Sequence, residues 1–66
     1  MKYQITRFGG QYIVRREAKN NAYVNWEIFN GYDFMGSVNW QEKIGKESVM
    51  DLDSAKAIIR DLRAAE

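Results

Sequence analysis

The chain has 66 residues, and its length bounds it to one small domain over residues 1–66. Ten basic and nine acidic residues leave a net charge of +1, below the basic excess typical of nucleic-acid-binding domains. The absence of cysteine and histidine excludes disulfides, thiol nucleophiles, imidazole catalysis and metal sites built from those two ligands.

The first predicted element is a β-hairpin over residues 3–16. Two β-prone runs, 3–8 and 11–16, are separated by two glycines, and a type I′ turn requires positive φ at both of its central residues. Pairing of Phe8 with Gln11 sets the register. This register places Tyr3, Ile5, Tyr12 and Val14 on one face, and Gln4, Thr6, Phe8, Gln11, Ile13 and Arg15 on the other.

A third strand is predicted over residues 23–29, after a turn that contains asparagine, a residue that tolerates left-handed φ. A three-residue loop, 20–22, would give the register that matches the apolar face of this strand with the face of Val14. With that loop, Val24, Trp26 and Ile28 share the face of Val14, and Tyr23, Asn25, Glu27 and Phe29 share the other face.

The dipeptide Asn30-Gly31 is typical of a tight hairpin turn. It predicts that residues 32–38 return as a fourth strand, although Gly36 weakens that strand. The sheet would then have three strands, or four if this return strand forms.

Beyond this point the sequence has two interpretations. Asn39, with a glutamate three residues later, fits the start of a short helical turn that would end at Gly45. The competing interpretation is a strand through Val38 and Trp40. We expect a short strand followed by a turn of helix.

The last predicted element is an amphipathic helix capped by Asp53. Its apolar residues recur at helical spacing, whereas its basic residues lie together on the opposite face. The apolar set is Ala55, Ile58, Ile59, Leu62 and Ala65, and the basic set is Lys56, Arg60 and Arg63.

These elements predict an α+β fold, in which a three- or four-stranded antiparallel β-meander carries one C-terminal amphipathic helix on one face. The order of three strands and a helix is similar to that of AP2-like and integrase arm-type DNA-binding domains, whose sheet enters the major groove. The expected core is Tyr3, Ile5, Tyr12, Val14, Val24, Trp26 and Ile28, closed by Ile58, Ile59 and Leu62.

Four apolar residues would lie on the sheet face away from the helix: Phe8, Ile13, Tyr23 and Phe29. One helix cannot cover both faces, so the chain's own middle segment, a second copy of the chain or a foreign partner must cover this one. We expect residues 35–50 to cover it in part, with Trp40 packed. The apolar edge near Phe8 and Tyr23 would then remain open as a protein-binding surface.

The charges are unevenly distributed along the chain. Residues 1–25 hold five basic residues and one acidic residue, whereas residues 26–53 hold two basic and six acidic residues. One interpretation is that these charges neutralise each other across a small fold. The other is a nucleic-acid-binding surface, because cations contact phosphate and aromatic rings stack on bases. Its candidate residues are Arg7, Arg15, Arg16 and Lys19.

No catalytic arrangement is expected, because no histidine activates the serines and the pair Asp51 and Asp53 fits helix capping. We expect no enzyme activity, no cofactor and no metal. The N-terminal residues do not resemble a signal peptide, and no apolar run reaches membrane-spanning length, so we expect a cytoplasmic protein. We also expect it to be a monomer or a weak homodimer.

The function expected from the sequence is that of a small non-enzymatic accessory protein that binds another protein, of the kind that phages and other mobile elements encode. The alternative is a nucleic-acid-binding module that uses the basic N-terminal hairpin.

Overall fold

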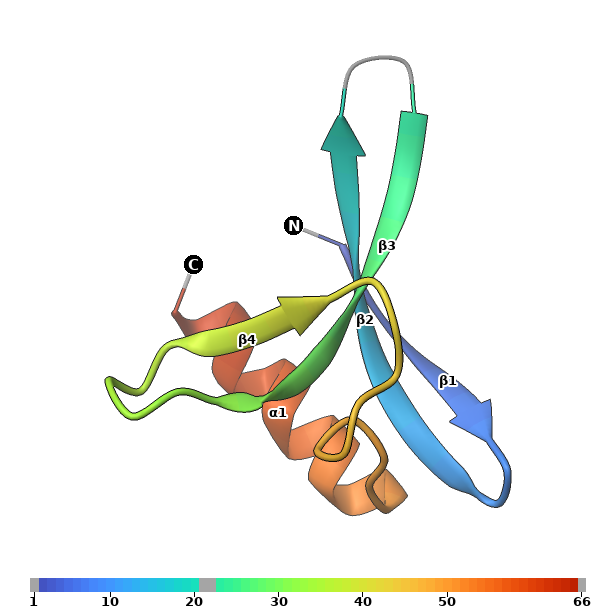
Figure 1. Cartoon of the computed structure of the whole chain (residues 1–66). Coiled ribbons are helices and arrows are strands. Elements are labelled where there is room, and N and C mark those ends of the chain that lie inside the picture. The colour runs from blue at the N-terminus through green and yellow to red at the C-terminus, as the bar shows by residue number, and fades with distance from the viewer. Residues whose placement is uncertain (1, 21–22, 66) are drawn as a thin grey trace.

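The computed structural model describes residues 2–20 and 23–65 and has the α+β architecture expected from the sequence (Figure 1). Its strands form one antiparallel sheet in the order β1-β2-β3-β4. Helix α1 follows the strands and packs against β1 and β2. The elements are β1 (Tyr3–Phe8), β2 (Gln11–Asn20), β3 (Tyr23–Tyr32), β4 (Val38–Gln41) and α1 (Leu52–Ala64).

The hairpin of β1 and β2 forms in the predicted register. Phe8 pairs with Gln11, and the two glycines between them have φ of 56° and 82°. Positive φ at both positions is the geometry of a type I′ turn, which glycine adopts without steric cost. Ile5 pairs with Val14, and both side chains face α1 as expected.

The register between β2 and β3 differs by one residue from the prediction. Asn20 pairs with Tyr23, so two residues connect the strands instead of three; both lie outside the described part of the chain. Arg15 consequently pairs with Ile28, whose side chain lies on the face away from α1. Phe29 packs against α1 instead. The prediction that Trp26 and Ile28 face the helix is therefore wrong, although Ile28 is buried on the other face. The side chain of Val24 lies outside the described residues.

The physical reason is that both faces of β3 carry large apolar residues, so the hydrophobic pattern selects neither register. Phe29 is only 3% exposed and packs with Val14 against α1. Its ring meets the rings of Tyr32 and Trp40 edge-on, at centroid distances of 5.4 and 6.2 Å. Phe29 therefore makes aromatic contacts at this site that an isoleucine could not make.

Asn30-Gly31 does not turn the chain, which corrects the strand predicted over residues 32–38. β3 continues to Tyr32, and the pairing with β4 shifts register between Phe29 and Tyr32. Gly31 supplies the positive φ, 79°, that this irregularity requires. The chain turns at residues 33–36 instead.

The strand interpretation of Val38 and Trp40 is confirmed, since both belong to β4. The helical turn predicted after them is wrong. Asn39 lies within β4 and caps nothing there, and Gly45 begins a turn that its carbonyl closes by accepting a hydrogen bond from Ser48 N at 3.3 Å.

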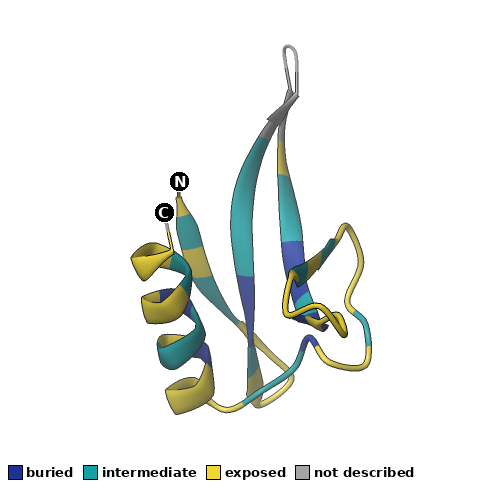
Figure 2. Ribbon diagram, turned by 90° about the vertical axis from the view of Figure 1, so that its left-hand side faces the viewer, coloured by how far each residue is buried: buried dark blue, intermediate teal, exposed yellow. Residues whose placement is uncertain are grey.

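The segment between β4 and α1 covers part of the second sheet face (Figure 2). The carboxamide oxygen of Asn30 accepts hydrogen bonds from Glu47 N at 3.0 Å and from Ser48 Oγ at 3.2 Å. Asn30 shares its face of β3 with Ile28, so these bonds place the segment on that face. Ile13 and Ile28 are accordingly buried within the chain itself.

Helix α1 begins two residues earlier than predicted, because Asp51 is its N-cap and Asp53 lies in its first turn. Asp51 Oδ1 accepts a hydrogen bond from Ser54 N at 3.0 Å. Just before this cap, Met50 and Tyr12 exchange two backbone hydrogen bonds of 2.8 and 2.9 Å. This bridge fixes the chain against β2, so the helix starts where the chain leaves the sheet.

Contacts with Ser54, first its hydroxyl and then its backbone N–H, hold the pKa of Asp51 below its ordinary value. The stabilisation from this carboxylate is therefore complete above the ordinary pKa and is lost as the pH falls through the lowered one. We predict that Ser54→Ala raises the pKa of Asp51 toward its ordinary value, because the hydroxyl contact is lost. NMR titration of the Asp51 carboxyl carbon in both proteins checks this, and an unchanged midpoint would contradict it.

The core predicts a sharp contrast between two neighbours in α1. Ile59 is 9% exposed and belongs to the core, whereas Arg60 is exposed. We predict that Ile59→Ala lowers the free energy of unfolding by about 2–5 kcal/mol, most of the stability that a domain of this size has. Arg60→Ala should change it by less than about 0.5 kcal/mol. Urea denaturation followed by circular dichroism measures both, and equal effects would refute the assignment of the helix face.

Candidate functional site

The four residues predicted to bind a partner do not form one surface in the structure. Phe8 is 48% exposed, but Ile13 on the same face is 4% exposed. Phe29 lies on the opposite face within the core, so the prediction that it points away from the helix is wrong. The one-residue difference in the β2–β3 register is the cause. The side chain of Tyr23 lies outside the described residues.

The four basic candidates do not gather on one face either. Arg7 is exposed near the end of β1, and the side chain of Lys19 lies outside the described residues. Arg15 and Arg16 are consecutive residues of β2, so their side chains point to opposite faces of the sheet.

Both of these arginines contact other side chains of the chain. Arg15 donates a hydrogen bond to Gln4 Oε1, and its guanidinium lies 4.6 Å from the centroid of the Trp26 ring. Arg16 Nε donates to Glu27 Oε1 at 2.7 Å, and its guanidinium lies 4.3 Å from the Trp40 ring. These contacts hold each guanidinium against an aromatic ring of the sheet, and that of Arg16 in an ion pair, rather than leaving both extended into solvent.

The pairing of Arg16 with Glu27 predicts the outcome of a charge swap. The two side chains are 28% and 29% exposed. Arg16→Glu should destabilise the protein, because it sets two carboxylates opposite each other and removes the contact with Trp40. Adding Glu27→Arg should restore part of the loss. The midpoint of urea denaturation measures the effect, and a double variant no more stable than Arg16→Glu alone would contradict the observed register.

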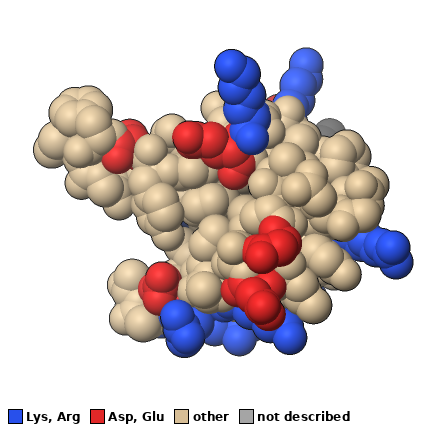
Figure 3. Space-filling view, turned by 90° about the horizontal axis from the view of Figure 1, so that it is seen from below, with Lys and Arg blue, Asp and Glu red and all other residues tan. Residues whose placement is uncertain are grey.

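Among the side chains that the structure describes, the most exposed large apolar ones lie at the end of the β3–β4 hairpin. Phe34 is 97% exposed, Met35 76% and Tyr32 49%. We call residues 32–35 the β3–β4 tip. The hairpin projects from the left side of the molecule in Figure 3, and uncharged surface dominates its end.

The turn at this tip is held by the Asp33 side chain. Asp33 Oδ1 accepts hydrogen bonds from Met35 N and Ser37 N, both at 2.9 Å. The backbone of Asp33 also receives a bond from Gly36 N and donates one to Ser37 O. Gly36 has a φ of 83°, which closes the turn without steric cost. Phe34 is therefore displayed on a turn with defined geometry.

The sequence interpretation missed this site because it placed residues 32–38 in a strand. The signal that could have revealed it is an aspartate followed by glycine three residues later, a pattern typical of a β-turn in which the aspartate side chain bonds to backbone amides. The two residues between them are the exposed Phe34 and Met35.

The described residues were also searched for metal sites and membrane-spanning helices. Within 2–20 and 23–65, no group of three or more acidic, histidine or cysteine side chains is placed to hold a metal ion. No helix in these ranges is long and apolar enough to cross a membrane. Comparison of the chain with protein families, curated proteins and solved structures finds no match.

Proposed function

We propose that this protein is a non-catalytic binding protein that engages another protein through the β3–β4 tip. The observation that carries the proposal is the exposure of Phe34 and Met35, 97% and 76%, on a turn closed by hydrogen bonds. Large apolar side chains exposed together are typical of interaction surfaces. Phenylalanine and methionine are also enriched at the centres of protein interfaces.

The geometry of the turn supports tight binding by so small a surface. Because Asp33 holds the backbone of the tip, a partner does not have to order the loop when it binds. Phe34 can then enter an apolar pocket of the partner as a preformed projection. Tyr32 and Met35 flank it and would exclude water from the rim of that pocket.

A protein partner fits this tip better than a nucleic acid does. Residues 32–38 contain Asp33 and no basic residue, so the tip has nothing that would attract phosphate. The N-terminal hairpin supports the nucleic-acid alternative less well than its composition indicated, because Arg15 and Arg16 are held by Trp26, Trp40 and Glu27.

The proposal keeps the class of function expected from the sequence and changes the surface. Among the candidate partner-binding residues whose side chains the structure describes, Phe8 is the one that is exposed, and it lies at the β1–β2 turn rather than in the β3–β4 tip. It therefore provides a matched control: the same residue type, also exposed, on the other hairpin.

We predict that Phe34→Ser weakens binding of the partner about 30-fold or more, the effect typical of a central interface residue. A benzophenone amino acid replaces Met35 in the protein expressed in the cells that naturally produce it. Irradiation then cross-links it to the bound partner, which mass spectrometry identifies. Calorimetric titration of the purified partner then compares the wild-type protein with Phe34→Ser and with the control Phe8→Ser. Both variants should keep the wild-type denaturation midpoint, because both side chains are exposed.

Two results would overturn the proposal. One is equal affinity of wild-type protein and Phe34→Ser for the captured partner. The other is capture of nucleic acid instead of protein, with binding that weakens steeply as salt is added.

A further inference from the structure

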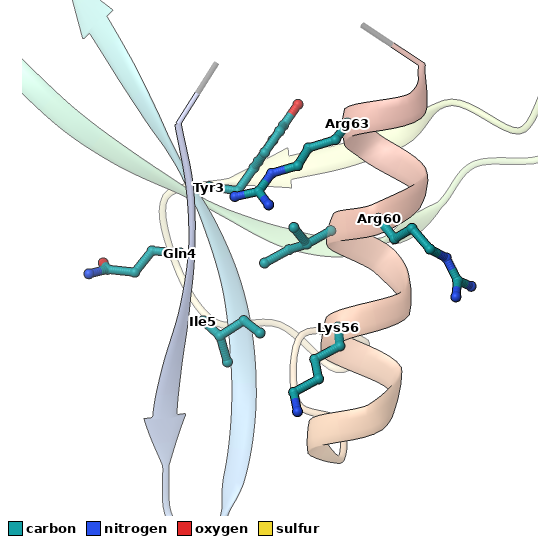
Figure 4. A pocket seen from close by; sticks show the side chains of 7 residues that line it. Tyr3, Gln4, Ile5, Lys56, Arg60 and Arg63 are labelled. Carbon is teal, nitrogen blue, oxygen red and sulfur yellow. The ribbon is translucent and has the colours of Figure 1, made fainter.

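A groove lies between β1 and α1, at the opposite edge of the sheet from β4 (Figure 4). Its volume is about 610 Å³, enough for several side chains. Its floor is largely apolar and is formed by Tyr3, Ile5 and Ile59. Figure 4 shows Tyr3 and Ile5 pointing toward the helix, whereas Gln4 points away from it.

The rim of this groove is basic. Lys56, Arg60 and Arg63 of α1 are among the residues that line it. In Figure 4 the side chains of Lys56 and Arg63 extend toward β1, and that of Arg60 is directed away. Lys56 and Arg63 are seven residues apart, about 10 Å along the helix axis.

The strand that forms the other wall has an open edge. β1 pairs with β2 on one side and is the first strand of the sheet. Hydrogen-bonded and non-hydrogen-bonded residue pairs alternate along an antiparallel hairpin. Phe8 and Gln11 form a hydrogen-bonded pair at the turn, and at the other end Glu17 N donates to Lys2 O at 3.0 Å. The pairs of Ile5 and Arg7 lie between these and are not hydrogen-bonded to β2. The N–H and C=O groups of Ile5 and Arg7 therefore face outward, where another strand could pair with them.

We infer that this groove binds an extended, acidic segment of a protein, which adds to the sheet as a strand beside β1. Same-face residues of a strand recur about every 7 Å, so neighbouring glutamates on its inner face can reach Lys56 and Arg63. The aliphatic parts of these glutamates would cover Ile5 and Ile59. The residues between them in the bound segment would point to the other face of the sheet, beside Gln4. Backbone pairing supplies affinity, and the basic rim supplies selectivity.

The charge of the groove favours an acidic protein segment over the other two possible occupants, a second copy of the chain and a nucleic acid. A second copy of the chain paired along β1 would bring the two basic rims together, which disfavours self-association. A nucleic acid could contact the cations, but it could not pair with the backbone of Ile5 and Arg7. This inference rests on the β1 edge alone and does not depend on the β3–β4 tip.

The test uses an eight-residue peptide that alternates threonine and glutamate, and a control peptide that alternates threonine and lysine. Amide hydrogen exchange of the whole protein is followed by NMR. The glutamate peptide should slow exchange at Ile5 and Arg7, whose amides face outward, and leave Gln4 and Thr6, already bonded to β2, nearly unchanged. The lysine peptide should have no such effect.

Charge reversal supplies a second measurement. Lys56→Glu combined with Arg63→Glu should weaken binding of the glutamate peptide at least about tenfold in a fluorescence titration. Lys43→Glu, the reversal of one charge at an exposed residue of the segment between β4 and α1, should leave it unchanged.

Three results would overturn the inference: no slowing at Ile5 and Arg7 at millimolar glutamate peptide, equal binding of the two peptides, or equal weakening by Lys43→Glu. Binding of a twelve-nucleotide single-stranded DNA at the groove without binding of the peptide would assign the basic rim to phosphate instead. None of these outcomes depends on Phe34, so this inference and the proposed function fail separately.

Discussion

The pairing of Arg15 with Ile28 is the constraint on which the rest of the molecule depends. It determines which side of β3 meets the helix, and it brings Phe29 into the core with Val14 and α1. The rings of Tyr32 and Trp40 then pack on Phe29, which joins the end of β3 and the short strand β4 to the same core. A shift of one residue would exchange the faces of β3 and remove all of these contacts.

The same register explains how the unevenly distributed charges are accommodated. Arg16, from the basic N-terminal part, faces Glu27 from the acidic middle part and pairs with it at 2.7 Å. Arg15 lies on the other face against Trp26. Two consecutive arginines that look like a nucleic-acid-binding pair in the sequence are thus separated by the pleat of one strand, and each stabilises the fold locally.

The sheet order separates the two surfaces that we assign to partners. β4 and the β3–β4 tip lie at one edge, and β1 with its groove lies at the other. One surface is an apolar projection and the other is a basic groove beside an open strand, so they suit partners of different chemistry. A chain of this size could hold two partners at once, because neither surface shares residues with the other.

Local patterns in the sequence determined those parts of the structure that depend on neighbouring residues. The two glycines after Phe8 specify the first hairpin and its register, because only one turn geometry suits positive φ at both positions. The spacing of apolar residues specifies α1 and its buried side. The lack of histidine and cysteine limits the chemistry that any site on this chain can perform, because composition alone removes imidazole and thiol groups.

Only the tertiary structure decided the features that join distant segments. The face of β3, the bulge at Gly31 and the start of α1 depend on Phe29, Asn30 and Met50 meeting residues far along the chain. The spacing of Asp33 and Gly36 indicates a turn, but the exposure of the β3–β4 tip follows only from β3 continuing through Gly31. The groove exists only because α1 packs beside β1. Sequence patterns of one short segment carry no information on these contacts, since both faces of β3 are apolar and long-range packing selects between them.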